Sequence, residues 1–350
     1  MAYTTIDKST DYFNTKLYTG NGSVRTETGV GFQPDWVWIK DRDGSNAHVL
    51  TDSVRGANYQ VYSNLTNTQT NASGYLTAFA SDGFTLGTDG AVNTNSNTYV
   101  SWNWKAGTTG SGNTSGSGTY KTYNYSVNTT AGFSIVKYTG NGTAGQTIPH
   151  HLGAVPKLII LKPLQAADNW RVYHIGIDAT APEDYHLQLQ SNGPRSDNAN
   201  IWNDTAPTST VFTIGSDSGV NTDNQTFIAY CFAEKTGYSR IGKYTGNENT
   251  DGTFVYTGFK PAFVLFKKNT GSNADWQLWD NKRDPSNPVE RAMHPNASGG
   301  ASTDQDIDFL SNGFKLRSNA SHLNANGVVF SYVSFGQSIV GSNNIPATAF

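Results

Sequence analysis

Hydrophobic residues occur along the chain in short runs, some continuous and some alternating with polar residues, and groups of Gly, Asn, Asp and Ser separate these runs. Short runs bounded by turn residues predict β strands rather than helices. Asn-Gly and Asp-Gly pairs, as at Asn21-Gly22 and Asp251-Gly252, are typical of tight hairpin turns. Only residues 288–293 could form a helical turn, or two at most. The pattern therefore predicts many short strands joined by turns.

One group of motifs occurs three times in the same order. Tyr-Thr-Gly-Asn begins at Tyr18, Tyr138 and Tyr244. A Pro-led apolar segment that ends on Lys follows each copy, at residues 34–40, 156–162 and 261–267. Further on come a short strand and an aromatic strand, at residues 83–86 and 99–102, 211–214 and 227–230, and 313–316 and 329–332. Repeated order over several motifs indicates an internal repeat.

We expect an all-β protein built from three tandem β-sandwich repeats of the jelly-roll or lectin-like kind, because each copy has the length of one small sandwich. The expected repeats are residues 1–106, 119–235 and 236–335. Residues 107–118, rich in Gly, Ser and Thr, predict a flexible linker. The C-terminal tail, residues 336–350, leaves the pattern; it either is disordered or docks on a neighbouring subunit.

Composition narrows the class of protein. Hydrophobic residues make up 36% and charged residues 15%, below the usual shares, while 12% aromatic residues argue against disorder. A net charge of −3 gives no basic surface for nucleic acid. No segment approaches the roughly 20 apolar residues needed for membrane insertion, and the N-terminus lacks a signal-peptide pattern. Cys231 is the single cysteine, so we expect no intrachain disulfide, and it lies in the apolar run 226–232, so we expect a buried, inert thiol. We therefore expect synthesis in a cytoplasm and another route of release.

The histidines do not form a pattern typical of catalysis. His150 and His151 are adjacent, so on a strand their side chains would face opposite ways and could not share a metal. His174 occupies the place that Asp52 and Asp280 hold in the other copies. A position that stays polar but changes residue predicts structural hydrogen bonding.

Acidic residues cluster by proximity only. The candidates for glycoside hydrolysis are Glu183-Asp184, Asp304 with Asp306 and Asp308, and Asp41 with Asp43, but sequence cannot give the separation of their carboxyl groups. The run Asp304, Asp306 and Asp308 resembles calcium-ligand spacing but lacks the later Gly and Glu, which favours a solvated loop. Because no catalytic motif is present, we expect no enzyme, no catalytic residue, no cofactor and no metal site. A glycan hydrolase is retained as an alternative.

Four tryptophans alternate along two predicted strands of the first repeat, which places them on one face of each strand. They are Trp36, Trp38, Trp102 and Trp104. Two interpretations stay open: these side chains contact a glycan, as in many carbohydrate-binding modules, or they fill a core.

At its repeats the sequence resembles virion structural proteins of marine tailed phages, often labelled tail-fibre-like. These proteins carry YTGNG…GFxPxxVWIK blocks that end in SDGFxLG and a Trp-rich strand. The matching stretches are residues 17–40, 81–107, 170–174, 206–212, 229–267 and 308–317. The resemblance departs after residue 335, where Gly336-Gln337-Ser338 replaces the expected acidic-aromatic ending.

The resemblance implies a component of the virion surface, assembled in the host cytoplasm and released by lysis. It implies a tail fibre or receptor-binding component that acts in host adhesion. The expected partners are further copies of the chain, with a trimer favoured, other virion proteins and a host-surface glycan. Two alternatives stay open: a head or tail decoration protein, and a carbohydrate-binding module or polysaccharide-degrading tailspike. No catalytic motif of the family transfers to this sequence.

Overall fold

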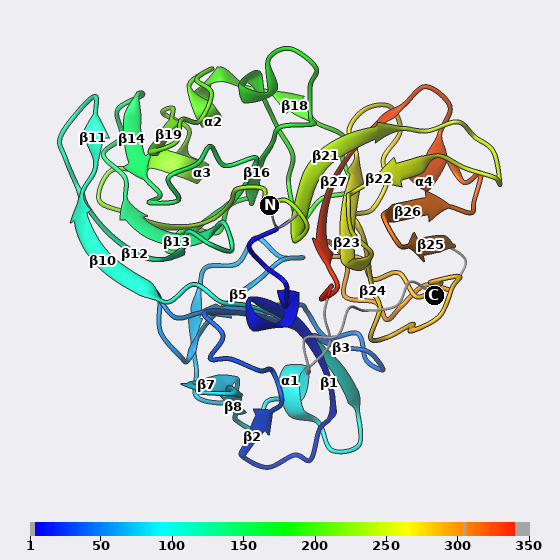
Figure 1. The fold of residues 1–350 in the computed structure, drawn as a ribbon. Helices are drawn as coiled ribbons and strands as arrows, with labels where there is room; N and C mark the ends of the chain where they lie inside the picture. Colours follow the sequence, from blue (N-terminus) through cyan, green and yellow to red (C-terminus); the bar gives the residue numbers. More distant parts are fainter. Residues whose placement is uncertain (1–3, 304–305, 340–350) are drawn as a thin grey trace.

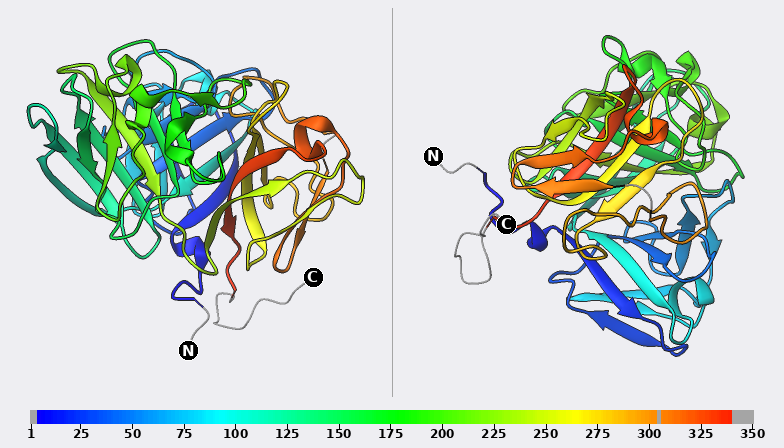
Figure 2. Two further views of the ribbon diagram at one scale, coloured as in Figure 1. Left: turned by 90° about the horizontal axis from the view of Figure 1, so that it is seen from above. Right: turned by 90° about the vertical axis from the view of Figure 1, so that its right-hand side faces the viewer.

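The computed structural model describes residues 4–303 and 306–339. In this part of the chain the strands form antiparallel sheets, and each α helix is four residues long. The predicted all-β class is confirmed. Three lobes lie around a common centre (Figure 1), and they stay in direct contact in two further views (Figure 2). No helix within the described ranges is long and apolar enough to cross a membrane.

The elements divide among the lobes in chain order. The first lobe contains the 3-10 helix η1 (Ser9–Asp11), β1 (Phe13–Thr19), β2 (Arg25–Thr28), β3 (Trp36–Asp41), β4 (Val49–Asp52), β5 (Tyr59–Tyr62), β6 (Thr70–Asn71), β7 (Leu76–Ala80), β8 (Gly83–Leu86), α1 (Gly90–Asn93) and β9 (Thr98–Trp104). The second contains β10 (Thr108–Asn113), β11 (Ser115–Gly116), β12 (Thr122–Asn128), β13 (Phe133–Thr139), β14 (Gln146–Pro149), β15 (Leu158–Pro163), β16 (Arg171–His174), η2 (Pro182–Asp184), β17 (Tyr185–His186), β18 (Ser196–Asp197), α2 (Ala199–Trp202), β19 (Val211–Ile214), α3 (Ser218–Asn221) and β20 (Thr226–Phe232). The third contains β21 (Ser239–Thr245), β22 (Phe254–Tyr256), β23 (Pro261–Lys268), β24 (Gln277–Asp280), β25 (Ile307–Leu310), β26 (Gly313–Leu316), α4 (Ser321–Asn324) and β27 (Val329–Gly336).

The three lobes share a strand order. The main sheets contain β1-β9-β3-β4, β13-β20-β15-β16 and β21-β27-β23-β24, so in each case the last of these strands in the chain lies between the first two. A smaller sheet in each lobe contains β2-β8, β14-β19 or β22-β26. Three copies of one sandwich would give these orders, and the tandem repeat and its boundaries stay a prediction.

The Tyr-Thr-Gly-Asn motif fastens the end of β1, β13 or β21 to a short helix. In the first lobe the Tyr18 hydroxyl donates to the carbonyl of Val92 at 2.9 Å, and the Asn21 N–H donates to the side chain of Asn93 at 2.9 Å. A Cβ atom at Gly20 would lie 2.2 Å from the Thr94 carbonyl oxygen. The motif therefore needs glycine because the helix end approaches the strand closely.

The same contacts recur in the other lobes. The Tyr138 and Tyr244 hydroxyls donate to Val220 and Leu323, and the Asn141 and Asn247 N–H groups donate to asparagine side chains of α3 and α4. The motif thus has a structural role, since it holds a strand of each lobe against a short helix.

Residues 107–118 are not a flexible linker, and that prediction is wrong. Most of the segment forms β10, which pairs with β12, and β11, which pairs with β14. The reason lies in the side chains of β12. Rings of Tyr123 and Tyr125 lie over Gly112 and Gly110, where a Cβ atom would come within 2.8 and 2.6 Å of their hydroxyl oxygens. Glycines in this strand make room for tyrosines that cover them.

Two further expectations concern the third lobe and the C-terminus. Residues 288–293 form no helical turn, and Val289 and Ala292 make isolated β bridges instead. At the start of the tail, the Gln337 N–H donates to the carbonyl of Lys260 and the Ile339 N–H donates to Asp7. Residues 340–350, on which the docking prediction depends, lie outside the described residues.

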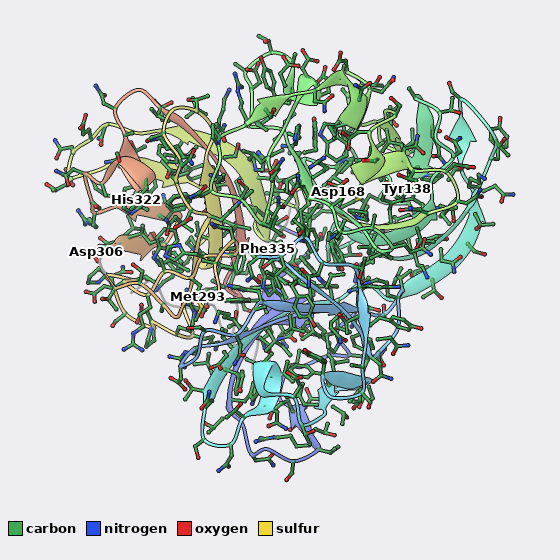
Figure 3. All side chains as sticks on the ribbon, turned by 180° about the vertical axis from the view of Figure 1, so that it is seen from behind. Tyr138, Asp168, Met293, Asp306, His322 and Phe335 are labelled. Atoms are coloured by element: carbon green, nitrogen blue, oxygen red, sulfur yellow. The ribbon has the colours of Figure 1, made fainter. Side chains whose placement is uncertain are left out.

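One hydrophobic cluster joins the three lobes at the centre. It includes Trp36 and Trp104 of the first lobe, Phe232 of the second, and Phe263 and Phe335 of the third. Phe335 lies near the meeting point of the lobes (Figure 3). Each lobe also has a separate core between its two sheets. The main sheets are therefore covered on both faces, which explains their nearly continuous apolar runs.

Candidate functional site

The four tryptophans proposed as glycan contacts lie in the central core. Trp36, Trp38, Trp102 and Trp104 are each at most 2% exposed. Trp36 lies opposite Trp104, and Trp38 opposite Trp102, so they share one face as the alternation predicted. That face packs against the other lobes: Trp36 stacks on Tyr230 with ring centroids 4.3 Å apart. This burial overturns the glycan-contact assignment, because the packing of the lobes leaves no free face for a sugar.

The position shared by Asp52, His174 and Asp280 lies at the contacts between lobes. Asp52 accepts hydrogen bonds from Arg55 Nε at 2.5 Å and from the Tyr230 hydroxyl of the second lobe at 2.8 Å. These three side chains are at most 6% exposed. A buried carboxylate paired with a guanidinium and a hydroxyl holds two lobes together and is not free to act as a base.

Asp280 makes the corresponding contact between the third and first lobes. It accepts from Arg283 Nε at 2.6 Å and from Trp102 Nε1 at 3.0 Å. The registers place Trp102 and Tyr230 at corresponding positions of β9 and β20, opposite Trp38 and Ile160. Tyr230 therefore donates a hydrogen bond to Asp52, and Trp102 donates one to Asp280, in each case across a contact between lobes.

His174 makes the third contact, between the second and third lobes. The corresponding residue of β27 is Val333, which cannot donate from its side chain. His174 Nε2 instead contacts the carbonyl of Tyr332 at 3.0 Å, while the Gly176 N–H donates to Nδ1 at 2.9 Å. An imidazole protonated at Nε2 satisfies both partners, and burial lowers the pKa of His174 to about 4. The predicted structural hydrogen bonding is confirmed at this position.

The lysines that end the three Pro-led segments are fully buried and bind backbone carbonyls. Lys162 donates to Thr66 of the first lobe at 3.1 Å, and Lys267 donates to Asn192 of the second at 2.8 Å. Lys40 donates within its own lobe. Burial lowers the pKa of each of the three to about 8. Two of these ammonium groups thus form further links between lobes.

Glu183 and Asp184 lie in η2 and are not buried. Three further sequence candidates, His150, His151 and Asp41, have structural partners. His150 contacts the Thr208 carbonyl at 3.1 Å, and His151 stacks on Tyr125. Asp41 accepts from the N–H groups of Asp43 and Gly44 and from two asparagine side chains, which organises a turn.

Cys231 is fully buried, and burial raises its thiol pKa. Asp308 pairs with Arg317 at 2.5 Å, and Asp304 lies outside the described residues. Within residues 4–303 and 306–339, no group of three or more His, Cys, Asp or Glu side chains could hold a metal ion.

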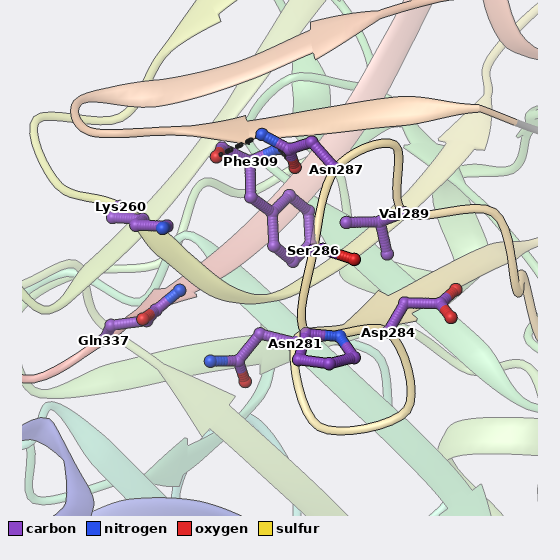
Figure 4. A pocket seen from close by; sticks show the side chains of 9 residues that line it. Lys260, Asn281, Asp284, Ser286, Asn287, Val289, Phe309 and Gln337 are labelled. Carbon is purple, nitrogen blue, oxygen red and sulfur yellow. Dashed lines mark hydrogen bonds between the residues drawn. The ribbon is translucent and has the colours of Figure 1, made fainter. Parts of the chain in front are cut away.

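A surface groove in the third lobe is a candidate for ligand binding. It has a volume of about 490 Å³ (Figure 4). Its floor contains Phe309 and Val289, which are nearly buried. Its polar wall consists of Lys260, Asn281, Asp284, Ser286, Asn287 and Gln337. A second hollow of about 240 Å³ shares Asn281 and Gln337 and extends toward β1 of the first lobe.

The loop after β24 fixes the groove. Asp284 accepts from the N–H groups of Glu290 and Arg291 at 3.0 and 2.7 Å. Asn287 exchanges two hydrogen bonds with the backbone of Phe309, and one of them is drawn in Figure 4. An apolar floor with amide, carboxylate and ammonium groups at its rim suits a polar ligand such as a saccharide.

Sequence reasoning missed this groove. Its lining comes from four separate segments, before β23, after β24, in β25 and after β27. None of these residues belongs to a repeated motif, so no sequence signal marked them.

The fold is a three-lobed all-β arrangement, and the third lobe carries a surface groove with a polar wall. The chain belongs to the family DUF7483, a domain of unknown function, whose model matches residues 8–338. No curated protein matches the chain, and no solved structure does.

Proposed function

We propose that this chain is a structural protein of the outer surface of a phage particle, and that it acts in host attachment as a tail-fibre or receptor-binding component. The resemblance of its repeats to marine tailed-phage virion proteins supports the proposal that the chain belongs to a phage particle. The groove of about 490 Å³ in the third lobe is the observation that supports attachment. Its proposed ligand is a host-surface glycan.

The chemistry of the groove favours binding over hydrolysis. Glycoside hydrolysis uses two carboxyl groups across the sugar, about 5–9 Å apart. Among the described lining residues Asp284 is the one carboxylate, and two backbone N–H groups and Arg291 hold it. The polysaccharide-degrading alternative lacks this support.

A variant that fills the groove tests the attachment role. Ser286→Trp places an indole in the groove, so virions that carry it should adsorb to host cells at least tenfold more slowly. Ser111→Trp, on exposed β10, is the matched control and should adsorb normally. Adsorption kinetics and binding to purified host polysaccharide are the measurements. Unchanged adsorption of the Ser286→Trp virions would count against the groove.

The place in the particle is a separate question. Electron microscopy of virions labelled with antibody to this chain should put the label on the tail. Label on the head would reject the fibre role and support the second candidate, a decoration protein. The exposed aromatic side chains of β22 favour that candidate, because such a protein binds its neighbours through surface patches. The trimer expected from the resemblance stays a prediction.

A further inference from the structure

The strand β22 exposes two aromatic side chains on an unpaired edge of the third lobe. Phe254 is 43% exposed and Tyr256 is 58% exposed, while Val255 between them is buried. In the described part of the chain β22 has β26 as its strand neighbour. A bare edge strand with apolar side chains is a template for another strand.

The backbone of this edge is directed outward at two residues. The Leu316 N–H donates to the Thr253 carbonyl at 3.1 Å, and the Thr257 N–H donates to Asn312 at 3.0 Å. Because antiparallel pairs alternate, these bonds make Val255 the residue that exchanges hydrogen bonds with β26. The N–H and carbonyl groups of Phe254 and Tyr256 consequently point away from the sheet.

The corresponding edges of the other lobes differ. In the second lobe β11 covers β14, and Ser115 lies opposite Thr147, the counterpart of Phe254. In the first lobe the uncovered strand β2 carries Thr26 and Thr28 at the two positions. Among the described residues, one edge is thus covered by a strand of the chain, one is polar, and the third is aromatic and has no strand over it.

We propose that β22 pairs antiparallel with β22 of a second copy of this chain, about a twofold axis at Val255. This register sets Phe254 of each copy opposite Tyr256 of the other. It pairs every outward N–H and carbonyl of these two residues, four hydrogen bonds in all, because directly opposite residues then form hydrogen-bonded pairs. The two aromatic pairs that result are among the stabilising cross-strand combinations.

The edge fits a second copy because the Phe-Val-Tyr segment is self-complementary in that register, as a twofold interface requires. The cover of β14 by β11 shows that this edge of a lobe accepts an added strand. In the described part of the chain no strand corresponding to β11 precedes β21, since only residues 233–238 separate β20 from β21.

Sedimentation velocity of the full chain over a range of concentrations tests the proposal. Wild type should reach the mass of two copies, and the double variant Phe254→Ser with Tyr256→Ser should weaken association at least tenfold. Tyr120→Ser is the matched control, since Tyr120 is 61% exposed elsewhere and its removal should leave the dimer intact. Circular dichroism checks that each variant is folded. A wild-type chain that stays monomeric, or a mass of three copies, overturns the proposal; the first result would leave the edge to a strand of a different protein.

Disulfide trapping tests the register independently. A mixture of Phe254→Cys and Tyr256→Cys chains should form a linked dimer at least tenfold faster than either variant alone. Opposite residues are close enough to bridge, whereas Phe254 of one copy lies diagonally from Phe254 of the other, beyond about 7 Å. The native Cys231 is buried and does not compete. Equal trapping in the mixed and single samples overturns this register.

Discussion

The repeated residues of this sequence are explained by short local contacts. In the Tyr-Thr-Gly-Asn motif, the tyrosine and asparagine bind a four-residue helix and the glycine permits its approach. The sequence predicted the motif as a mark of repetition. It could not predict the contact, because each helix lies 74 to 82 residues further along the chain.

The close approach at Gly140 leads to a stability prediction. A Cβ atom there would lie 2.5 Å from the carbonyl oxygen of Thr222, so Gly140→Ala should lower the free energy of unfolding by about 1–3 kcal/mol. Gly299→Ala is the control, since a Cβ at Gly299 meets nothing within 4 Å. Chemical denaturation of both variants measures the difference. Equal stabilities would show that the helix end yields to the added methyl group.

Buried histidines make stability depend on pH. Burial lowers the pKa of His150, His174 and His186 to about 4, and that of His48 well below its usual range. Between pH 4 and 6.5 the unfolded chain therefore binds more protons than the folded one, and stability falls as the pH falls through this window. Burial raises the pKa of Asp35. Between the usual pKa of an aspartate and this raised pKa the folded chain binds more protons than the unfolded one, so Asp35 increases stability as the pH falls.

Melting temperatures from pH 7 to pH 4 should record this loss. His174→Gln keeps an amide donor for the Tyr332 carbonyl and removes one titrating group, so its melting temperature should depend less steeply on pH. Identical slopes for the variant and wild type would mean that His174 does not contribute.

At the scale of elements, one position per lobe joins the next lobe. Asp52 and Asp280 meet donors on a neighbouring strand, and His174 supplies a donor where the neighbour offers only a carbonyl. The sequence predicted hydrogen bonding at this position. It did not predict that the partner belongs to another lobe, because the motifs describe each copy separately.

Removing one of these carboxylates should destabilise the protein strongly. Asp280→Ala leaves Arg283 buried without its partner, and breaking a buried ion pair in this way costs about 3–5 kcal/mol. Asp251→Ala, which removes an exposed partner of Lys315 and Arg317, should have little effect. Urea denaturation compares the two. Similar losses in both variants would contradict the structural role given to Asp280.

The β10 ribbon shows where composition misleads. Its Gly, Ser and Thr content predicted a linker, yet alternate glycines lie under Tyr123 and Tyr125 of the next strand. The tyrosines that make this segment a strand lie outside the low-complexity segment itself.

At the scale of the whole molecule, the lobes share one core. Strand positions and the all-β class followed from the apolar runs, and the four tryptophans were placed correctly on a common face. Their burial could not be predicted, because the alternation of a strand does not say what covers its outer face. The groove of the third lobe likewise depends on segments that only the assembled fold brings together.

A shared core predicts cooperative unfolding. A chain limited to residues 236–339 would expose Phe263, Val333 and Phe335, which the other lobes cover in the intact protein. We expect this fragment to aggregate or to remain unfolded, and the full chain to unfold in one calorimetric transition. Three separate transitions would show that the lobes are independent.

The three contacts between lobes arrange the lobes in a closed ring. As a result, residues near the start of the first lobe lie beside residues that follow the last strand of the third lobe. The Thr10 N–H lies 3.4 Å from Ser338 Oγ, and Ser9 Oγ donates to the Gln337 carbonyl at 3.3 Å. The same ring of lobes would therefore result if the chain began with the second or the third lobe instead of the first. A circular permutant that joins residues 339 and 4 by a short linker and opens between residues 236 and 237 should keep every central contact and melt within a few degrees of the original.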